Sequence, residues 1–447
     1  MKKFDKKSLL LFVALGLLLS LSVAIIYLSL TTQPEPVESL GTIRLVVFCL
    51  LLPILIKYFL QLIIAPFYSI FEALGRLKYP PIEPLVTVLI PAWNEQVGII
   101  KTLNSVLDAY YNNLEVIVIN DGSTDKTHDL VTQFLSDYQH IQFCKPKIKY
   151  LRLPNGGKAR ALNQGLKFAS GEIIITVDAD SVMDKDTVTN LVKRFNDPKV
   201  GAVAGNVVIG NKKKPLAIIQ QLEYLYGFFF KRADSVFNSV YIIGGAAAAY
   251  RKSVLKAVGG FDHQIITEDI EMSTRILAKG YKTRYAADAV VYTEGPADWT
   301  GLCNQRLRWK YGRILTFLKH RRLFFSNNKK HQPYLTFLIL PLAVYAEFTL
   351  LLEGPLLLLF YGYTVFASDY FPLAFVIVLM SLIIGMQILF DSKRRFHANL
   401  LMLAPVAWII FYIIDIVEFQ ALWRSLKRLI RRESLQWQRW VRAGVMN

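Results

Sequence analysis

The acidic pair Glu268-Asp269 stands among apolar residues, and a carboxylate in such a setting is suited to take a proton in catalysis. The same residues also form a typical helix start, with Thr267 as the cap and the acids in the first turn. The two interpretations are compatible, because a helix N-terminus holds a carboxylate rigidly and favours its ionised form. Asp269 is therefore a candidate general base at the beginning of a helix.

A second acidic motif, DAD at residues 178–180, directly follows the apolar run 173–177. Two carboxylates at a strand end suit a hard divalent cation that bridges a diphosphate, because Mg²⁺ and Mn²⁺ prefer oxygen ligands and keep substrate oxygens in their shell. The structural alternative is a turn whose Asp caps a helix. Asp178 and Asp180 are thus candidates for binding a metal and an anion.

Three polar loops could bind a nucleotide beside the DAD motif. The PAWNE motif at 91–95 and the NDGS motif at 120–123 each follow an apolar run, and they offer carboxylates for base or ribose groups. No G-x-G-x-x-G follows these runs, which disfavours a dinucleotide oxidoreductase. The stretch 155–160 (NGGKAR) adds glycines and cations, Lys158 among them, that suit a phosphate.

The QRLRW motif at residues 305–309 combines arginines with a tryptophan. Guanidinium groups give planar donors for a diphosphate, and an indole face can stack on the apolar side of a sugar. A basic juxtamembrane helix with an interfacial Trp is the alternative interpretation.

The elements that must position these motifs are short apolar runs at 86–90, 115–119 and 173–177, each followed by a helical pattern. This alternation predicts an α/β domain with a mostly parallel sheet. Ligands of such sheets bind beyond the carboxyl ends of the strands. We therefore expect the polar strand ends to meet at one edge.

The composition indicates a membrane protein. The chain has 447 residues, of which 53% are hydrophobic, and 52 Lys and Arg against 34 Asp and Glu give a net charge of +18. This balance fits basic flanks beside membrane spans or a membrane enzyme with anionic substrates. No nucleic-acid-binding module is recognisable, so no nucleic-acid partner is expected. Cys49, Cys144 and Cys303 form neither a metal spacing nor a disulfide framework, which fits a reduced cytosolic face.

The pattern of apolar stretches predicts four regions. They are two N-terminal transmembrane helices (1–75), a cytosolic domain with interfacial helices (82–325), a C-terminal membrane region of about three segments (333–420) and an amphipathic basic tail (421–447). The first span, 8–30, is too long for a signal peptide. Residues 215–230 form an amphipathic helix that is either a core helix or an interfacial one.

Two features of the C-terminal region stay open. As one helix, residues 333–366 would be about 50 Å long against a hydrocarbon core of about 30 Å, so either an interfacial segment precedes the span or the helix breaks at Gly354-Pro355. Three C-terminal spans would put the tail outside, whereas its arginines favour the cytosol.

The ordered set of strand–PAWNE, strand–NDGS, strand–DAD, TED and QRLRW resembles the family 2 inverting glycosyltransferases with a GT-A fold, and specifically the processive membrane synthases. The resemblance covers the soluble domain and extends to the flanking spans. It implies a GT-A nucleotide-sugar-binding domain between transmembrane helices, in the cytosol at a bacterial cytoplasmic membrane. The implied partners are a UDP-sugar donor, a growing polysaccharide and the lipid bilayer, with Mg²⁺ or Mn²⁺ as cofactor.

The resemblance also implies a role for each motif residue. Asp269 is the implied general base and Asp180 the implied metal ligand. The implied donor-binding residues are Pro91, Ala92, Asn94, Glu95, Asp121, Lys158, Asp178 and Arg308. The implied acceptor- or polymer-binding residues are Glu268, Gly245, Gln305 and Trp309.

Among these synthases, the chain is most similar to the bacterial poly-β-1,6-N-acetylglucosamine synthases, because two helices lead, TED replaces a GED-type motif, and no regulatory domain trails QRLRW. This implies UDP-GlcNAc as donor and a small membrane accessory subunit, often under cyclic di-GMP control. The lack of an FxVTxK segment and of a cellulose-synthase-type C-terminal module argues against cellulose. Hyaluronan or chitin-oligomer synthesis and transfer of one sugar to a lipid stay open. A non-enzymatic polysaccharide export subunit is the alternative of another class, and the intact acidic motifs argue against it.

Overall fold

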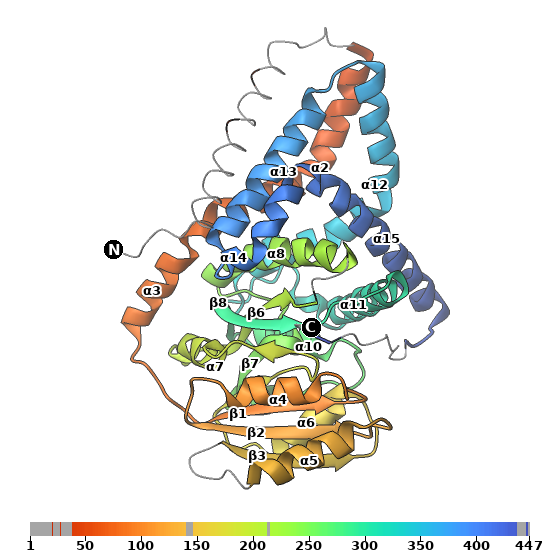
Figure 1. Cartoon of the computed structure of the whole chain (residues 1–447). Coiled ribbons are helices and arrows are strands. Elements are labelled where there is room, and N and C mark those ends of the chain that lie inside the picture. The colour runs from red at the N-terminus through yellow and green to blue at the C-terminus, as the bar shows by residue number, and fades with distance from the viewer. Residues whose placement is uncertain are drawn as a thin grey trace.

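The computed structural model describes residues 38–139, 146–211, 215–435 and 444–445, together with Ser20 and Tyr27. The first expected span (8–30), Cys144 and most of the tail beyond 435 lie outside the described residues. A sheet domain forms one end of the molecule and long helices form the other (Figure 1). Helices α8 (Pro215–Val236) and α11 (Trp299–Lys319) lie in the layer between them.

Within the described residues, one eight-stranded sheet runs in the order β3-β2-β1-β4-β7-β6-β8-β5. The strands are β1 (Val86–Ala92), β2 (Leu114–Asp121), β3 (Lys147–Leu153), β4 (Ile173–Thr176), β5 (Val182–Met183), β6 (Val200–Ile209), β7 (Ala248–Arg251) and β8 (Lys282–Thr293). The four strands from β3 to β4 are parallel, whereas β7 runs antiparallel to both of its neighbours and β5 antiparallel to β8. The sheet is therefore mixed, and the mostly parallel prediction holds for the half that contains the three predicted strands.

Helices on both faces of the sheet bury its parallel half. Every residue of β2 is buried, which fits a continuous apolar run rather than an alternating one. The sheet domain also contains α4 (Ile99–Leu107), α5 (Thr127–Gln139), α6 (Lys158–Phe168), α7 (Thr187–Val192), α9 (Lys252–Val258) and α10 (Glu268–Ala278). Leu103 of α4 packs in the core on one face, and Leu162 of α6 packs in the core on the other. The parallel order β2-β1-β4 brings the three predicted polar strand ends to one edge, as expected.

Helix α8 joins the sheet domain to the long helices. Its Leu222 and Leu225 pack against Ile384 and Ile388, whereas its Phe228 packs against the cores under the sheet. One face of α8 therefore covers the sheet domain, and the other packs against the long apolar helices.

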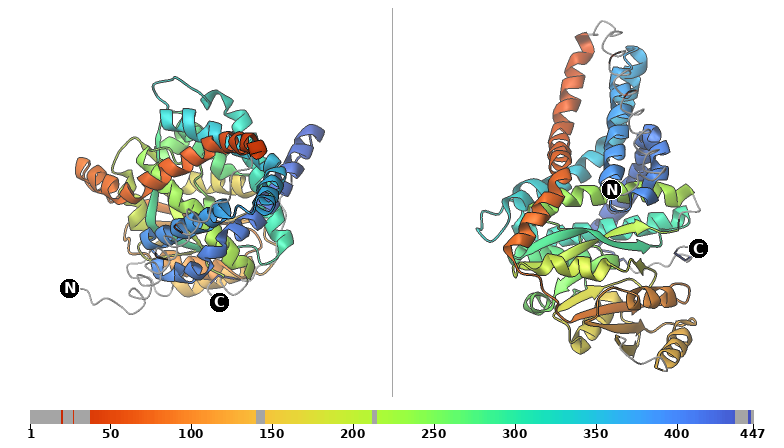
Figure 2. Two further views of the ribbon diagram at one scale, coloured as in Figure 1. Left: turned by 90° about the horizontal axis from the view of Figure 1, so that it is seen from above. Right: turned by 60° about the vertical axis from the view of Figure 1, so that its left-hand side comes forward.

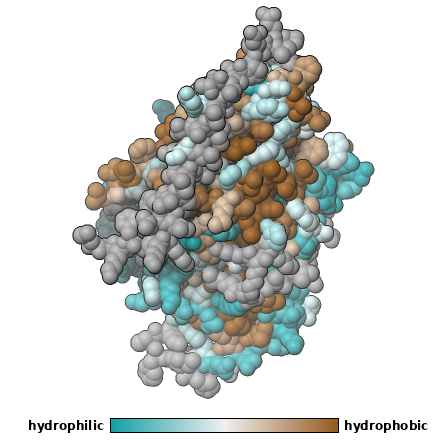
Figure 3. Space-filling model, turned by 45° about the horizontal axis from the view of Figure 1, so that its top comes forward, coloured by the Kyte–Doolittle hydropathy of each residue, from teal (hydrophilic) through white to brown (hydrophobic). Residues whose placement is uncertain are grey.

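By length and composition alone, the described residues contain four helical stretches long and apolar enough to cross a membrane: Leu45–Gly75, Tyr334–Phe366, Phe371–Phe390 and Arg394–Arg431. They include α2 (Glu38–Ile64), α3 (Tyr68–Lys78), α12 (Leu340–Phe366), α13 (Phe371–Phe390), α14 (Arg394–His397) and α15 (Ala407–Arg431). Helices α2, α12 and α13 rise together away from the sheet (Figure 2). Apolar side chains gather over this part of the surface, and hydrophilic ones over the sheet domain (Figure 3).

Two C-terminal elements bear on the points that the sequence leaves open. A π-helix (Tyr334–Ile339) precedes α12, and α12 continues through Pro355, so the alternative of a break at Gly354-Pro355 is not seen. A proline removes only one backbone donor, which a long apolar helix tolerates.

The last apolar segment, 394–431, has both ends beside the sheet domain. At its start, Ser392 Oγ donates to the Ala287 carbonyl at 2.8 Å. At its end, Tyr311 of α11 donates to the Glu433 carbonyl at 3.0 Å. Helix α15 also runs through the expected boundary between 420 and 421 as one element. Both ends of this segment therefore lie on the sheet-domain side of the long helices.

Candidate active site

The carboxylate of Asp121, at the end of β2, holds the glycine loop before α6. Its Oδ1 accepts from the N–H of Gly156 at 3.0 Å and its Oδ2 from the N–H of Gly157 at 2.7 Å. Gly157 has a φ of 88°, a conformation that glycine adopts without strain. Asp121 therefore places Lys158, the first residue of α6, at the carboxyl edge of the sheet.

The loop after β1 is fixed to the loop after β2. Pro91 and Ala92 lie within β1 and pair with β2. The Asn94 side-chain oxygen accepts from the N–H of Thr124 at 2.7 Å, and the backbone N–H of Glu95 donates to Thr127 Oγ1 at 2.9 Å. The four predicted donor-site residues of the PAWNE motif are thus all connected to β2 or to the loop that follows it.

The two acids of the DAD motif face different partners. Asp180 is 9% exposed, and its Oδ1 accepts from Ser181 Oγ at 3.1 Å. A Cβ at Gly98 would lie 2.7 Å from the Ala179 carbonyl oxygen, so α4 begins in close contact with this loop. Asp178 instead lies 2.5 Å from Lys158 Nζ. The two acids therefore have different neighbours, and Asp180 as a metal ligand stays a prediction.

Lys158 connects the DAD motif to the TED motif. Its Nζ lies 2.5 Å from Asp178 and 3.4 Å from Glu268 Oε1. Burial favours the neutral amine, but the carboxylates of Asp178, Glu268 and Asp269 outweigh it and hold the pKa of Lys158 above its ordinary value. Burial and the neighbouring Asp269 charge raise the pKa of Glu268, although Lys158 opposes them. The site thus holds three acids around one cation.

Asp269 is held by backbone donors on both oxygens. Gly245 N–H donates to Oδ2 and Ile270 N–H to Oδ1, each at 2.8 Å. Each oxygen keeps a second lone pair, since a carboxylate has about four acceptor sites. Thr176, at the end of β4, donates its hydroxyl to the Gly245 carbonyl at 3.2 Å. The predicted base is therefore tied to the same sheet edge as the DAD motif.

Helix α10 begins at Glu268, as the sequence predicts, but the predicted Thr267 cap is not formed. Thr267 occupies the cap position without a side-chain hydrogen bond to the helix. Its hydroxyl instead packs against α11, because a Cβ at Gly312 would lie 2.2 Å from Thr267 Oγ1. Close packing between α10 and α11 has displaced the cap.

The QRLRW motif lies on α11, between the sheet edge and the membrane helices. Arg306 is 4% exposed and makes a bidentate pair with Glu223 of α8, at 2.7 Å for each guanidinium nitrogen. Its guanidinium carbon is 4.4 Å from the Trp309 ring centroid. Gln305 is buried, and within the described residues its side-chain oxygen has no hydrogen-bond partner. The motif therefore presents a fixed indole and an unused acceptor.

Tyr224 of α8 links this helix to the DAD motif. Its ring centroid lies 6.5 Å from that of Trp309. Burial raises the pKa of its phenol, and among the nearby charges Asp180 also raises it whereas Arg308 lowers it. Tyr224 therefore lies beside Trp309, and the charges of Asp180 and Arg308 both act on its phenol.

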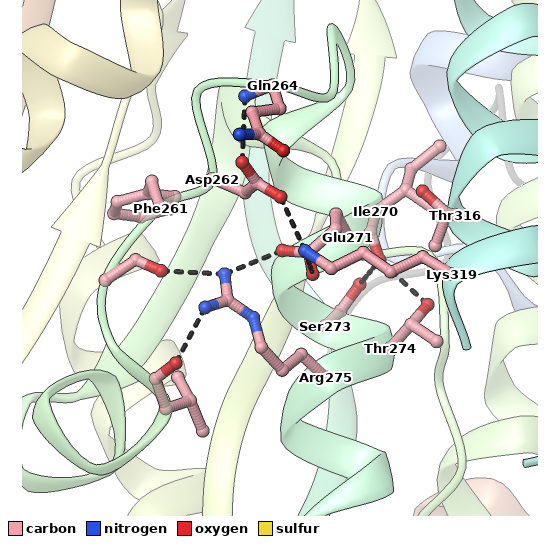
Figure 4. Close-up of polar contacts among 12 residues, drawn as sticks. Phe261, Asp262, Gln264, Ile270, Glu271, Ser273, Thr274, Arg275, Thr316 and Lys319 are labelled. Atoms are coloured by element: carbon pink, nitrogen blue, oxygen red, sulfur yellow. Dashed lines mark hydrogen bonds and ion pairs between the residues drawn. The ribbon is translucent and has the colours of Figure 1, made fainter. Parts of the chain in front are cut away.

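Sequence reasoning missed three residues of this region. Tyr224 and Lys231 lie on α8, and Asp269 acts on the pKa of Lys231, which burial lowers to about 8. The third is Glu271, two residues after Asp269 and fully buried. Arg275 and Lys319 hold its carboxylate at 2.6 and 2.8 Å (Figure 4). The only sequence signal was that TED continues as TEDIE, which also fits a solvated helix face.

The donor set fits a divalent cation that depends on its substrate. Within the described residues, no group of three or more His, Cys, Asp or Glu side chains could enclose a metal. One buried carboxylate, Asp180, suffices for a cation that takes its other ligands from a diphosphate and water, which is the usual manner of Mg²⁺.

Comparisons with known proteins identify relatives of this chain. Residues 87–259 match the family model Glycosyl transferase family 2. The poly-beta-1,6-N-acetyl-D-glucosamine synthase of Staphylococcus aureus strain COL is 37% identical over 248 residues, which are 55% of this chain and 57% of that protein. The protein of that name from Staphylococcus epidermidis is 37% identical over 231 residues, 51% of this chain and 54% of that protein. The chain thus spans little more than half the length of these relatives.

A solved structure has the same fold. The mannosyltransferase from Pyrobaculum calidifontis in complex with GDP-Man and Mn²⁺ has a TM-score of 0.54 at 21% identity, over 86% of this chain and 99% of that one. The expected GT-A architecture, with flanking helices apolar enough to span a membrane, is therefore confirmed at the level of the fold. The family match thus covers the part of the chain that carries the PAWNE, NDGS and DAD motifs.

Proposed function

We propose that this protein is a membrane-bound, inverting and processive β-glycosyltransferase that polymerises N-acetylglucosamine from UDP-GlcNAc into a poly-β-1,6-linked polysaccharide for export. One observation carries the proposal: Lys158 bridges Asp178 of the donor edge and Glu268 of the TED motif, directly beside Asp269. This geometry puts a candidate base next to the place where a nucleotide diphosphate would bind.

The donor would bind along the carboxyl edge of the parallel strands. Glu95 and Asp121 lie at this edge and would recognise the uridine, and the amides of Gly156 and Gly157 would hold the Asp121 carboxylate in position for this contact. Arg308 and Lys158 supply positive charge for the diphosphate. Asp180 would hold Mg²⁺ or Mn²⁺, which when bound would neutralise part of the charge on the departing diphosphate.

Asp269 would act as the general base. As the acceptor hydroxyl oxygen attacks the anomeric carbon, its proton passes to Asp269, the bond between that carbon and the diphosphate oxygen breaks, and the electron pair of that bond leaves with UDP. The backbone donors on both Asp269 oxygens fix the carboxylate for this transfer. A single in-line displacement converts an α-linked donor into a β-linked product.

The acceptor would approach from α11 and the membrane side. The Trp309 indole, held by Arg306, can stack on the terminal sugar. The unused side-chain oxygen of Gln305 can accept from a sugar hydroxyl. Gly245 would let Lys158 stay beside Asp269 during the attack, since a side chain at this position would meet the Lys158 ammonium.

The choice of product rests on the relatives named poly-beta-1,6-N-acetyl-D-glucosamine synthase. We propose a cytosolic catalytic domain at a bacterial cytoplasmic membrane, with α2, α12 and α13 as crossing helices and the segment 394–431 returning to the cytosolic side. A small membrane accessory subunit belongs to the same proposal.

The decisive experiment is a donor panel. Membranes containing the full chain are given UDP-GlcNAc, UDP-Glc, UDP-GlcA or UDP-Gal with Mg²⁺ or Mn²⁺, and UDP release, product length and linkage are measured. We expect release with UDP-GlcNAc alone and a long β-1,6-linked product. A single transferred sugar would contradict processivity, and a polymer from another donor would favour a hyaluronan-type synthase. The absence of release with every donor would favour a non-enzymatic export subunit.

A further inference from the structure

A cavity lies away from the catalytic edge, at the C-terminal end of α11. It has a volume of about 500 Å³, and Lys319, His320, Arg321, Arg322 and His331 line it. No acidic side chain lines it. An anion is the ligand that such a lining favours, because guanidinium groups bind phosphate oxygens with planar paired donors.

Two of the lining cations are available for a ligand. Lys319 is already paired with Asp262 at 2.5 Å and with Glu271 at 2.8 Å. Arg321 and Arg322 are both exposed, and in the part of the chain that the structure describes neither has an acidic partner. Their charge is therefore compensated only by solvent, and a phosphate can replace that solvent.

The position of the cavity indicates whether its phosphate belongs to a lipid or is a free anion. Only a few residues separate it from the apolar stretch Tyr334–Phe366, which is long enough to cross a membrane. Leu318 in its lining is 57% exposed, and Phe325 and Phe337, whose rings contact each other, are 62% and 45% exposed. Exposed apolar side chains mixed with basic ones are typical of a surface that lies in the headgroup region of a bilayer. A phospholipid headgroup, rather than a free anion, matches both features.

The cavity is connected to the candidate base through helix α10. Lys319 and His320, on its wall, contact the buried Glu271 carboxylate at 2.8 and 3.0 Å. Glu271 lies two residues after Asp269 on the same helix, and Figure 4 shows Lys319 reaching it from α11. His331 contacts the carbonyl oxygen of Ala278, the last residue of α10, at 3.0 Å. A ligand in the cavity would therefore touch the ends of both α10 and α11.

We propose that this cavity binds the phosphate of an anionic phospholipid headgroup, and that the bound headgroup holds α11 against α10 and so raises turnover at Asp269. The binding site stands on its own geometry, whereas the effect on turnover rests on the proposed function. Through helices α10 and α11, turnover would then depend on the lipid composition of the membrane.

The first experiment measures UDP release by the full chain in nanodiscs of phosphatidylcholine, with or without phosphatidylglycerol. We expect phosphatidylglycerol to raise turnover about tenfold, and the Arg321→Gln/Arg322→Gln variant to lose most of this activation. The matched control, Lys167→Gln/Lys256→Gln, removes the same charge from exposed positions on α6 and α9 and should keep the activation. Equal activation of all three proteins would overturn the proposal.

The second experiment does not depend on activity. The unfolding midpoint of the detergent-solubilised chain is measured with short-chain phosphatidylglycerol, short-chain phosphatidylcholine or inorganic phosphate. We expect a rise with phosphatidylglycerol in the wild type and the control, and no rise in Arg321→Gln/Arg322→Gln. An equal rise with inorganic phosphate would contradict the lipid source, and no rise with any anion would overturn the site. If the lipid-specific rise occurs but no donor is turned over, the proposed function fails while the binding site stands.

Discussion

The backbone N–H of Gly245 donates to Asp269 Oδ2 at 2.8 Å, and a Cβ at position 245 would lie 2.6 Å from Lys158 Nζ. One glycine therefore both orients the candidate base and makes room for the cation beside it. The contact explains why a residue without side-chain chemistry belongs to the site.

Replacing this glycine should damage catalysis more than folding. In Gly245→Ala the flexible end of Lys158 moves away, which breaks its contact with Asp178 and shifts the charge around Asp269. We expect kcat to fall about a hundredfold, since small misplacements of catalytic groups have effects of this size. The unfolding midpoint should change little. Gly244→Ala is the matched control, because a Cβ there meets nothing within 4 Å and the backbone is extended. Equal kcat values for the two variants would contradict the role of position 245.

The base assignment is tested by Asp269→Asn. The amide keeps the shape of the side chain and can still accept from Gly245, but it cannot take a proton. We expect turnover to fall about a thousandfold or more, while the Kd for UDP, measured by calorimetry, stays within about twofold. Glu268→Gln serves as the comparison, because that carboxyl is buried against Lys158 and should alter KM rather than abolish turnover. A variant Asp269→Asn that keeps more than a few per cent of activity would show that another group is the base.

The packing of α10 on α11 gives a separate prediction. In Gly312→Ala the new methyl group would lie 2.2 Å from Thr267 Oγ1, in a place where both helices are buried. Overpacking of this kind costs about 1–3 kcal/mol of unfolding free energy, and it should also lower turnover because Asp269 begins α10. Gly227→Ala in α8 is the control, since nothing lies within 4 Å of its Cβ. Thermal unfolding and UDP release are measured on both. Identical melting curves would show that the helices can separate without cost.

Local sequence signals predicted the parallel strands and their polar ends well. Strands β1, β2 and β4 are continuous apolar runs with polar ends, so both their existence and the position of Asp121 and Asp178 at one edge follow from the pattern. The remaining strands carry no such signal. Charged residues alternate along β3, and glycines and an asparagine interrupt β6.

Contacts between segments that are distant in the sequence could not be predicted from local sequence patterns. Thr267 looks like a helix cap, and only the approach of Gly312 shows why its hydroxyl is used for packing. Hydropathy gives the length of the last apolar segment but not its direction, so the return of 394–431 to the sheet domain became visible only through Ser392 and Tyr311. Glu271 is the clearest case, because its partners Lys319 and His320 lie on another helix.

The buried Glu271 carboxylate should support the fold of the α10–α11 pair. Removing one member of a buried ion pair costs roughly 3–5 kcal/mol when its partner is left without compensation. We expect Glu271→Gln to lower the unfolding midpoint, because Arg275 and His320 lose this carboxylate and Lys319 keeps only Asp262. Glu172→Gln, which removes an exposed carboxylate, is the control and should leave the midpoint nearly unchanged. Similar midpoints for both variants would contradict the prediction that Glu271 stabilises the α10–α11 pair.

The pH dependence of this contribution has a definite sign. Burial alone would raise the pKa of Glu271, but hydrogen bonds from His320 and Lys319 and the charge of Arg275 hold it below its ordinary value of 4.5. The unfolded chain therefore binds the proton first as the pH falls, so the stabilisation is complete above about pH 4.5 and is lost as the pH drops through the lowered pKa. The midpoint difference between wild type and Glu271→Gln should thus be largest near neutral pH and shrink below about pH 4.5. Melting curves of both proteins in the same detergent, recorded from about pH 7 to about pH 3, measure this difference directly. A difference that stays constant over this range would mean that Glu271 is not ionised in the folded protein.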